Sequence, residues 1–327
     1  MASGSLGRRL VACLLNVSEA RRKDLVESVA RAAVYDARGA RREETTVLNI
    51  FNDHDYNRSV ITIVASIDSI REAVLSACEK ACGLIDMRNH TGVHPCMGAV
   101  DLIPIYPLGE EVAVEDCAKE ARAVAEGLTE RVPGSSVFLF GWADAPLQRG
   151  LAQRRRDMGW FKKTADTRLI RPDVGPQPQK RYGLTGVGAS PYVMNCNVTV
   201  DTRDIAAGRD IAAAIRESAP GGLPGVQVLA LPHEGAVEIA CNVESVKGSR
   251  AAAGQPWPSF SISGQTYCHA PASLITERVA ELAGRRGVGT KGTALVGFTP
   301  AECRGLAEGA LSRGIAEFWR ERRRVHM

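Results

Sequence analysis

Apolar and polar positions divide the first 160 residues into short segments that alternate between strand and helix patterns. The continuous apolar run Leu10–Val17 has the length of a buried strand. Ser18 is expected to cap the following helix, which runs to about Tyr35 with Glu19 near its positive end. The other elements predicted here are strands at 46–52, 59–66, 99–106 and 136–141, and helices at 69–85, 114–130 and 147–156. The order β-α-β-β-α-β, followed by α-β-α, predicts a sheet with helices on one face.

The second half of the chain repeats the same rhythm. Tyr192–Val200 alternates as a strand, and Thr299 is expected to cap a final helix that runs to about Arg323. The other elements predicted in this half are helices at 204–218 and 272–282, and strands at 226–230, 236–243 and 294–298. The order is again β-α-β-β-α-β-α, so we expect an α/β (α+β) fold built from two related subdomains. Each should be a mixed β-sheet with helices on its outer face.

A segment rich in proline and glycine separates the two halves. Prolines at 172, 176 and 178 and glycines at 175, 183 and 186 are typical of a loop or linker. We therefore divide the chain into residues 1–178 and 179–327. The Gly-, Ala-, Ser- and Pro-rich segment 247–263 is predicted to be a mobile insertion in the second part that buries little apolar surface.

Composition narrows the class of protein. Hydrophobic residues make up 45% and charged residues 24%, which is ordinary for a folded protein and argues against disorder. The net charge of +4 is too balanced to indicate a nucleic-acid partner, and we interpret the basic clusters 153–156 and 320–324 as solvated helix faces. Apolar runs are too short for a membrane span. The nine cysteines include no CxxC pair, which suits reduced thiols and a cytoplasmic location.

The first candidate for chemistry is the loop from His90 to Pro95, between a predicted helix and a predicted strand. Gly92 permits a positive φ, and Pro95 moves His94 out of the α region. A histidine held on such a loop can act as a general acid and base, because its ordinary pKa lies near neutrality. The spacing of His90 and His94 would suit zinc on a helix, but Gly92 and Pro95 argue against a helix. We therefore predict no metal and assign His90 to shaping the loop.

A polar cluster lies at the turn between the strands at 46–52 and 59–66. Its candidate site residues are Asp53, Asp55, Asn57 and Arg58. A carboxylate here could orient His94, and Arg58 could bind a substrate carboxylate through two parallel hydrogen bonds. The alternative is an ordinary solvated hairpin.

Several motifs resemble the formiminotransferase family, which includes the formiminotransferase-cyclodeaminases. The longest is H-x-G-x-H-P-x-M-G-A-x-D, from His90 to Asp101. The segments Leu14–Glu19, Asn57–Val60 and Pro172–Pro176 also resemble family segments, in the same order along the chain. The resemblance covers most of the sequence, without the cyclodeaminase half.

The resemblance implies a reaction and a set of site residues. His94 matches the family's catalytic histidine. It would act as general acid and base in the transfer of a formimino or formyl group between glutamate and tetrahydrofolate. Folate would lie in a cleft between two facing sheets, in a cytoplasmic homodimer, with no metal. The resemblance assigns folate binding to Gly175, Pro176, Gln177, Pro178, Gln179, Lys180, Arg181, Tyr182 and Gly183. A plain interdomain linker is the alternative for this stretch.

Two positions depart from the family pattern. Cys96 stands where the resembling motif has arginine, and Ser190 replaces a second arginine. The loss of two cations that would contact acidic substrates leaves a second hypothesis open. The chain would then be a catalytically weak or inactive folate-binding protein.

Overall fold

The computed structural model describes residues 7–160, 170–252 and 254–322. Its larger sheet has the strand order β2-β3-β1-β4-β6-β5. The first four of these strands pair antiparallel, whereas β6 pairs in parallel with both β4 and β5. The strands are β1 (Leu10–Val17), β2 (Thr45–Asp53), β3 (Arg58–Ser66), β4 (Val100–Pro107), β5 (Val137–Gly141) and β6 (Thr185–Ala189).

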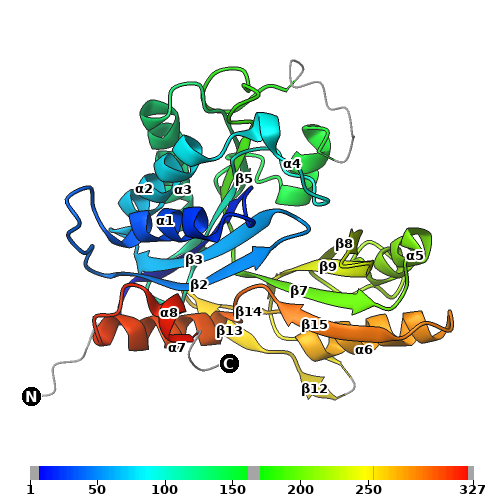
Figure 1. Cartoon of the computed structure of the whole chain (residues 1–327). Helices are drawn as coiled ribbons and strands as arrows, with labels where there is room; N and C mark the ends of the chain where they lie inside the picture. The colour runs from blue at the N-terminus through cyan, green and yellow to red at the C-terminus, as the bar shows by residue number, and fades with distance from the viewer. Residues whose placement is uncertain (1–6, 161–169, 253, 323–327) are drawn as a thin grey trace, which may run out of the picture.

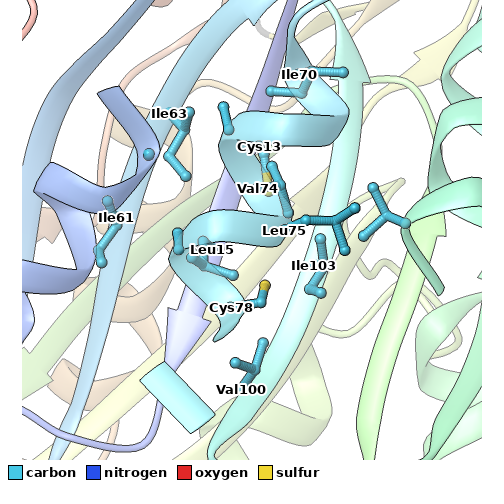
Figure 2. Close-up of a cluster of buried hydrophobic side chains, with 14 of the residues drawn as sticks. Cys13, Leu15, Ile61, Ile63, Ile70, Val74, Leu75, Cys78, Val100 and Ile103 are labelled. Atoms are coloured by element: carbon cyan, nitrogen blue, oxygen red, sulfur yellow. The ribbon is translucent and has the colours of Figure 1, made fainter. Parts of the chain in front are cut away.

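Three helices cover one face of this sheet: α1 (Lys23–Val34), α2 (Ile70–Leu84) and α3 (Val114–Arg131) (Figure 1). Between them and the sheet lies a core of aliphatic side chains, part of which is drawn in Figure 2. Strand β1 is buried throughout, because Val11, Cys13 and Leu15 enter this core while Leu10 and Leu14 pack on the other face. The continuous apolar run of β1 therefore reflects burial on both faces.

The second sheet has the order β15-β7-β9-β8 and is antiparallel throughout. Its elements are β7 (Val193–Val200), α5 (Ile205–Ile215), β8 (Val226–His233), β9 (Ala236–Glu244), α6 (Ala272–Gly284) and β15 (Thr290–Leu295). Matched in chain order, β8-β9-β7-β15 repeats the arrangement β2-β3-β1-β4 of the first sheet. The prediction of two related β-α-β-β-α-β sheets is thus confirmed, and the fold is α+β. Only the first sheet is mixed, however; the second was also expected to be mixed, but all of its strand pairs are antiparallel.

A second core joins the two sheets. It combines Leu10 and Leu14 of β1 with Met194 and Cys196 of β7 and with apolar side chains of α5, α6 and α7 (Pro300–Ser312). Thr299 caps α7 as predicted, since its hydroxyl oxygen accepts from the Glu302 backbone N–H at 3.3 Å. The helix ends at Ser312, however, and a separate α8 (Phe318–Arg322) follows; the predicted endpoint Arg323 lies outside the described residues.

Ser18 does not cap the first helix, which begins at Lys23. The Ser18 hydroxyl donates to the Gly98 carbonyl at 2.7 Å, and its backbone N–H bonds to the carbonyl of Ala99. Ser18 therefore ties the end of β1 to the segment before β4. Glu19 instead accepts from the backbone N–H groups of Arg21 and Arg22 at 2.9 and 3.1 Å, which stabilises the turn into the helix.

Two other predicted helix and strand boundaries also shift. The helix predicted at 147–156 is α4 (Leu151–Asp157), and the strand predicted at 294–298 is β15 at 290–295. The larger sheet extends past the predicted boundary at residue 178, because β6 belongs to it. None of the helices described is long and apolar enough to cross a membrane.

The predicted insertion 247–263 carries short strands. These are β10 (Val246–Lys247), β11 (Ala251–Ala252), β12 (Gln255–Pro256) and β13 (Ser259–Ile262), and β13 pairs with β14 (Gln265–Cys268). Trp257 and Ile262 are buried, with 7% and 2% of their surfaces exposed. The expectation that this segment buries little apolar surface is therefore wrong.

Candidate active site

A cavity of about 690 Å³ lies between the two sheets. Residues from β1 to β4 form one wall and residues from β7 to β9 form the other. Alternating side chains reach the cavity, because successive residues of a strand point to opposite faces. The lining from the first sheet includes Asn16, Asp53, Arg58, Leu102, Pro104 and Tyr106, and that from the second includes Val193, Asn195, Asn197, Ala240, Asn242 and Glu244.

His94 lines this cavity from the loop between η1 (Met87–Asn89) and β4. Its Nδ1 lies 2.8 Å from the carbonyl oxygen of Pro95. A carbonyl can only accept, so Nδ1 carries the hydrogen and Nε2 is the basic nitrogen of the neutral ring. The imidazole lies between the rings of Tyr56 and Trp160, at centroid distances of 5.2 and 5.9 Å. In this tautomer Nε2 is the nitrogen that can accept a proton, and the imidazole also contacts the neighbouring Cys96 thiol.

Gly92 is required in the histidine loop for a different reason from the one predicted. Its φ is not in the left-handed region. A Cβ at this position would lie 2.2 Å from the backbone oxygen of Tyr56, so only glycine fits. Asn57 also holds the histidine loop against the turn between β2 and β3, because its Nδ2 donates to the Thr91 carbonyl at 3.1 Å. Its Oδ1 accepts from the Ala20 N–H at 3.0 Å.

His90 lies at the start of the histidine loop. Its Nδ1 lies 3.1 Å from the carbonyl oxygen of Ser18, and burial lowers its pKa. It does not line the main cavity but a second one of about 400 Å³, together with Glu19, Arg21 and Asp86. The two histidines of the motif therefore face different cavities.

Arg58 reaches the main cavity, but its guanidinium is already engaged. It pairs with Asp101 and donates to Asn16 Oδ1 at 3.0 Å. Burial favours a raised pKa for Asp101, but the charge of Arg58 outweighs burial and the pKa is lowered. Asp101 also accepts from the Met97 N–H at 2.7 Å. Arg58 thus stabilises the end of the histidine loop. The prediction that its guanidinium is free to bind a substrate carboxylate is not supported.

Asp53 and Asp55 contact the turn between β8 and β9 rather than His94. Asp53 Oδ2 lies 2.8 Å from His233 Nε2, and Asp55 accepts from the Glu234 N–H at 2.7 Å. Burial tends to lower the pKa of His233, but the charges of Glu238 and Asp53 outweigh it and raise the pKa. The carboxylate expected to orient His94 therefore orients a histidine of the second sheet.

Tyr56 connects these groups and was missed in the sequence. Its hydroxyl donates to Glu238 Oε1 at 2.7 Å, and its ring lies between His94 and His233. Asn197 Nδ2 donates to the same carboxylate oxygen at 2.9 Å. Burial, followed by the charge of Glu238, raises the pKa of Tyr56. The tyrosine is therefore a fixed, neutral wall of the cavity beside His94.

The basic cluster 153–156 is not a solvated helix face. Arg154 is 3% exposed and pairs with Asp173, and Arg155 lines the cavity. The Arg155 guanidinium lies over the Trp160 ring at 4.4 Å, and burial lowers its pKa to about 10. The helical spacing of Leu151, Arg154 and Met158 marks the buried face in the sequence. The charge of Asp101 acts on Arg155, but among the described residues no carboxylate lies close enough to form an ion pair with it.

The stretch from Gly175 to Gly183 lies outside the lining described for the main cavity. Ser136 donates to the Pro176 carbonyl at 2.6 Å, and Arg181 pairs with Asp86 at 3.2 Å. Asp86 lines the second cavity, so this loop lies beside that cavity. Gly183 has a φ of 71°, and a Cβ there would lie 1.9 Å from the Met97 carbonyl oxygen. Folate binding by this stretch stays a prediction.

Comparison with known proteins gives the family. Residues 10–190 match the model of the formiminotransferase domain, N-terminal subdomain. The chain is 34% identical over 258 residues to the formiminotransferase cyclodeaminase-like protein of Arabidopsis thaliana, covering 73% of this chain and 83% of that protein. It is 31% identical over 244 residues to the glutamate formimidoyltransferase of Thermoplasma acidophilum, covering 73% and 78%.

A third relative is a longer protein, and the similarity covers less than half of it. The formimidoyltransferase-cyclodeaminase of Gallus gallus is 31% identical over 248 residues, which cover 72% of this chain and 44% of that protein. The family model spans more than half of the 327 residues, and it includes the histidine loop and the whole larger sheet. The chain belongs to the formiminotransferase family.

Proposed function

We propose that the chain is a one-carbon transferase that moves a formimino group between glutamate and tetrahydrofolate in the cavity between the two sheets. The relative in Thermoplasma acidophilum is named a glutamate formimidoyltransferase, and the cavity volume is suited to a ligand of folate size. The observation that carries the proposal is His94, which lines this cavity with Nδ1 bound to the Pro95 carbonyl and Nε2 as the basic nitrogen.

The proposed reaction needs two proton transfers. The folate N5 attacks the amidine carbon of formiminoglutamate, a C–N bond forms, and the N5 proton passes to His94 Nε2. In the second step the bond from that carbon to the glutamate nitrogen breaks, and His94 returns the proton to the departing nitrogen. The products are 5-formiminotetrahydrofolate and glutamate. One imidazole near neutral pH can serve both steps.

Arg155 supplies a cation for the donor. Both Arg155 and His94 contact the Trp160 ring, so a carboxylate bound at Arg155 would lie close to the imidazole. Arg58 is occupied by Asp101 and therefore offers less. Arg155 would compensate for the arginines replaced by Cys96 and Ser190.

The test is the variant His94→Ala, assayed with tetrahydrofolate and formiminoglutamate by absorbance of the acid-cyclised product. We expect turnover to fall by about 10²- to 10⁴-fold while tetrahydrofolate binding persists, because the imidazole moves protons and contributes little to packing. His54→Ala, at an exposed histidine outside the cavity lining, is the matched control and should retain most of the activity. Turnover of His94→Ala near the wild-type rate would remove His94 as the acid and base.

Cys96 supports an alternative, a folate-binding protein with little or no catalysis. Its thiol lies 3.7 Å from Arg58 Nη1, in the position where the resembling motif has arginine. Wild-type protein that binds tetrahydrofolate but shows no turnover with formiminoglutamate would favour this alternative.

A further inference from the structure

The second sheet presents a row of three carboxamides to the cavity. Gln227 of β8 lies opposite Asn242 of β9, which lies opposite Asn195 of β7. All three line the cavity. Adjacent strands lie about 4.8 Å apart, so the row offers hydrogen-bonding groups at regular intervals across the sheet.

Two of these amides bond to each other and leave groups for a ligand. Asn195 Nδ2 donates to Asn242 Oδ1 at 2.6 Å. In the described part of the chain, neither side chain forms another hydrogen bond. The amide network therefore keeps an acceptor on Asn195 and a donor on Asn242 beside the cavity.

Glu244 stands two residues further along β9 and also lines the cavity. Its carboxyl forms no hydrogen bond or ion pair with any described residue. Burial, followed by the charge of Glu217, raises its pKa to about 7. Glu244 is half-buried and faces the cavity, so its carboxyl is free to accept hydrogen bonds from a ligand that carries N–H donors.

The opposite wall is apolar and suits a flat ring. It includes Leu102, Pro104 and Tyr106 of β4 and Phe140 of β5. A heteroaromatic ring with one polar edge could lie against these side chains and turn that edge toward the amides and Glu244.

We infer that Gln227, Asn242, Asn195 and Glu244 form the subsite for the amino-pyrimidinone edge of a reduced pterin. This inference rests on the function proposed above. The edge presents two neighbouring N–H donors, which a carboxylate accepts together, and a carbonyl oxygen, which an amide N–H can bind.

The direction of the strand agrees with this assignment. From Asn242, β9 continues back to Glu238, whose carboxylate holds Tyr56 beside His94. Four residues of a strand span roughly 14 Å. A bicyclic ring that lies along this stretch has its pyrimidine edge at the amides and its N5 side toward His94.

Binding can be measured without catalysis, because Trp142 and Trp160 line the cavity and their fluorescence should report tetrahydrofolate. We expect Glu244→Gln and Asn242→Ala each to weaken tetrahydrofolate binding about tenfold or more, as for loss of a hydrogen bond to a charged or buried group. Glu277→Gln, an exposed carboxyl on α6, is the matched control and should bind like wild type. Melting temperatures check that the variants fold.

A tetrahydrofolate analogue in which methyl replaces the 2-amino group tests the contact itself. Wild type should bind it more weakly than tetrahydrofolate, whereas Glu244→Gln should discriminate little between the two. Equal discrimination by both proteins would overturn the inference, because the carboxyl would then not contact that amino group.

The pH dependence supplies a second readout. Wild-type affinity should rise with pH through about 7, because only ionised Glu244 accepts both N–H groups. Arg216 and Lys247 line the cavity with Glu244, and the charge of Glu217 acts on its carboxyl; His94 lines the cavity from the first sheet, and His233 pairs with Asp53. All remain in Glu244→Gln, so the difference between the two profiles isolates Glu244. Identical profiles would overturn the inference.

The outcomes separate the inference from the proposed function. Unchanged or tighter binding in a stably folded Glu244→Gln protein overturns the inference, and tighter binding would indicate that the acidic folate tail lies beside Arg216 and Lys247. The proposed function would still stand if His94→Ala abolished turnover. Wild-type protein that does not bind tetrahydrofolate overturns both.

Discussion

The two sheets share one strand order but differ in how they are buried. In the first sheet, β1 is buried on both faces, and β3 is buried except at its last residue. In the second sheet, buried and half-buried residues alternate along β7, and every residue of β15 is exposed. The same topology therefore serves two purposes. The first sheet is the rigid support of the histidine loop, and the second offers a polar face to the cavity.

One ionic group on each wall illustrates the same contrast. On the first sheet, Arg58 pairs with Asp101 and donates to Asn16. On the second sheet, Glu244 has no such partner among the described residues. Groups that are satisfied internally hold the loop in place, whereas groups without a partner remain available to a ligand.

The largest expected effect concerns stability. Leu15→Ala should lower the free energy of unfolding by about 2–5 kcal/mol, because it leaves a void in the fully buried core drawn in Figure 2. Leu295→Ala on β15 is the matched control, since 37% of that side chain is already exposed, and should cost less than about 1 kcal/mol. Urea unfolding followed by circular dichroism measures both. Equal losses of unfolding free energy in the two variants would contradict the proposed difference in burial between the two sheets.

A smaller effect is expected on the donor. Arg155→Ala should raise KM for formiminoglutamate about tenfold or more and leave the affinity for tetrahydrofolate nearly unchanged, because a charge-assisted contact to the donor is lost. Steady-state kinetics at saturating tetrahydrofolate measure this. Arg155→Lys should recover part of the loss, and Arg285→Ala, an exposed arginine after α6, should behave as wild type. A normal KM in Arg155→Ala would show that another group binds the donor carboxylate.

The smallest effect concerns the contact between the two sheets. The pKa of His233 is raised in the folded protein, so its ion pair with Asp53 adds stability below the unfolded value near 6.5. This contribution is lost as pH rises through the folded pKa. Wild type should therefore exceed His233→Gln in stability by less than about 1 kcal/mol at pH 6, and the difference should shrink toward pH 8. Thermal melting of both proteins from pH 6 to pH 8 measures this difference. A difference in stability that stays constant over the range would exclude the ion pair.

Local pattern was enough to predict much of the fold. The apolar run Leu10–Val17 and the capping residue Thr299 depend on nearby sequence, and both occur as predicted. Ser18 failed as a cap because its hydroxyl bonds to Gly98, 80 residues away. The position of β6 between β4 and β5 likewise depends on pairing between distant segments, which periodicity does not reveal.

The motif placed His94 on a loop, and the structure shows that this loop lines the cavity. Gly92 is fixed by the backbone of Tyr56, which belongs to another turn and which the motif does not reveal. Arg155 was taken for a surface residue because its cluster is strongly basic, although the neighbouring helical spacing indicates a buried face. Glu244 lies in an ordinary alternating strand, and its lack of a partner is visible only once the sheets are assembled.

The placement of β6 has a consequence for how the chain is made. Among the strands described for this sheet, β5 pairs with β6, which comes more than 40 residues later in the sequence. During synthesis, β5 and the bare edge of β4 must wait for residues 185–189 to leave the ribosome. A fragment ending at residue 178 would leave the backbone groups of β4 and β5 that face β6 without hydrogen-bond partners, and such open edges favour aggregation.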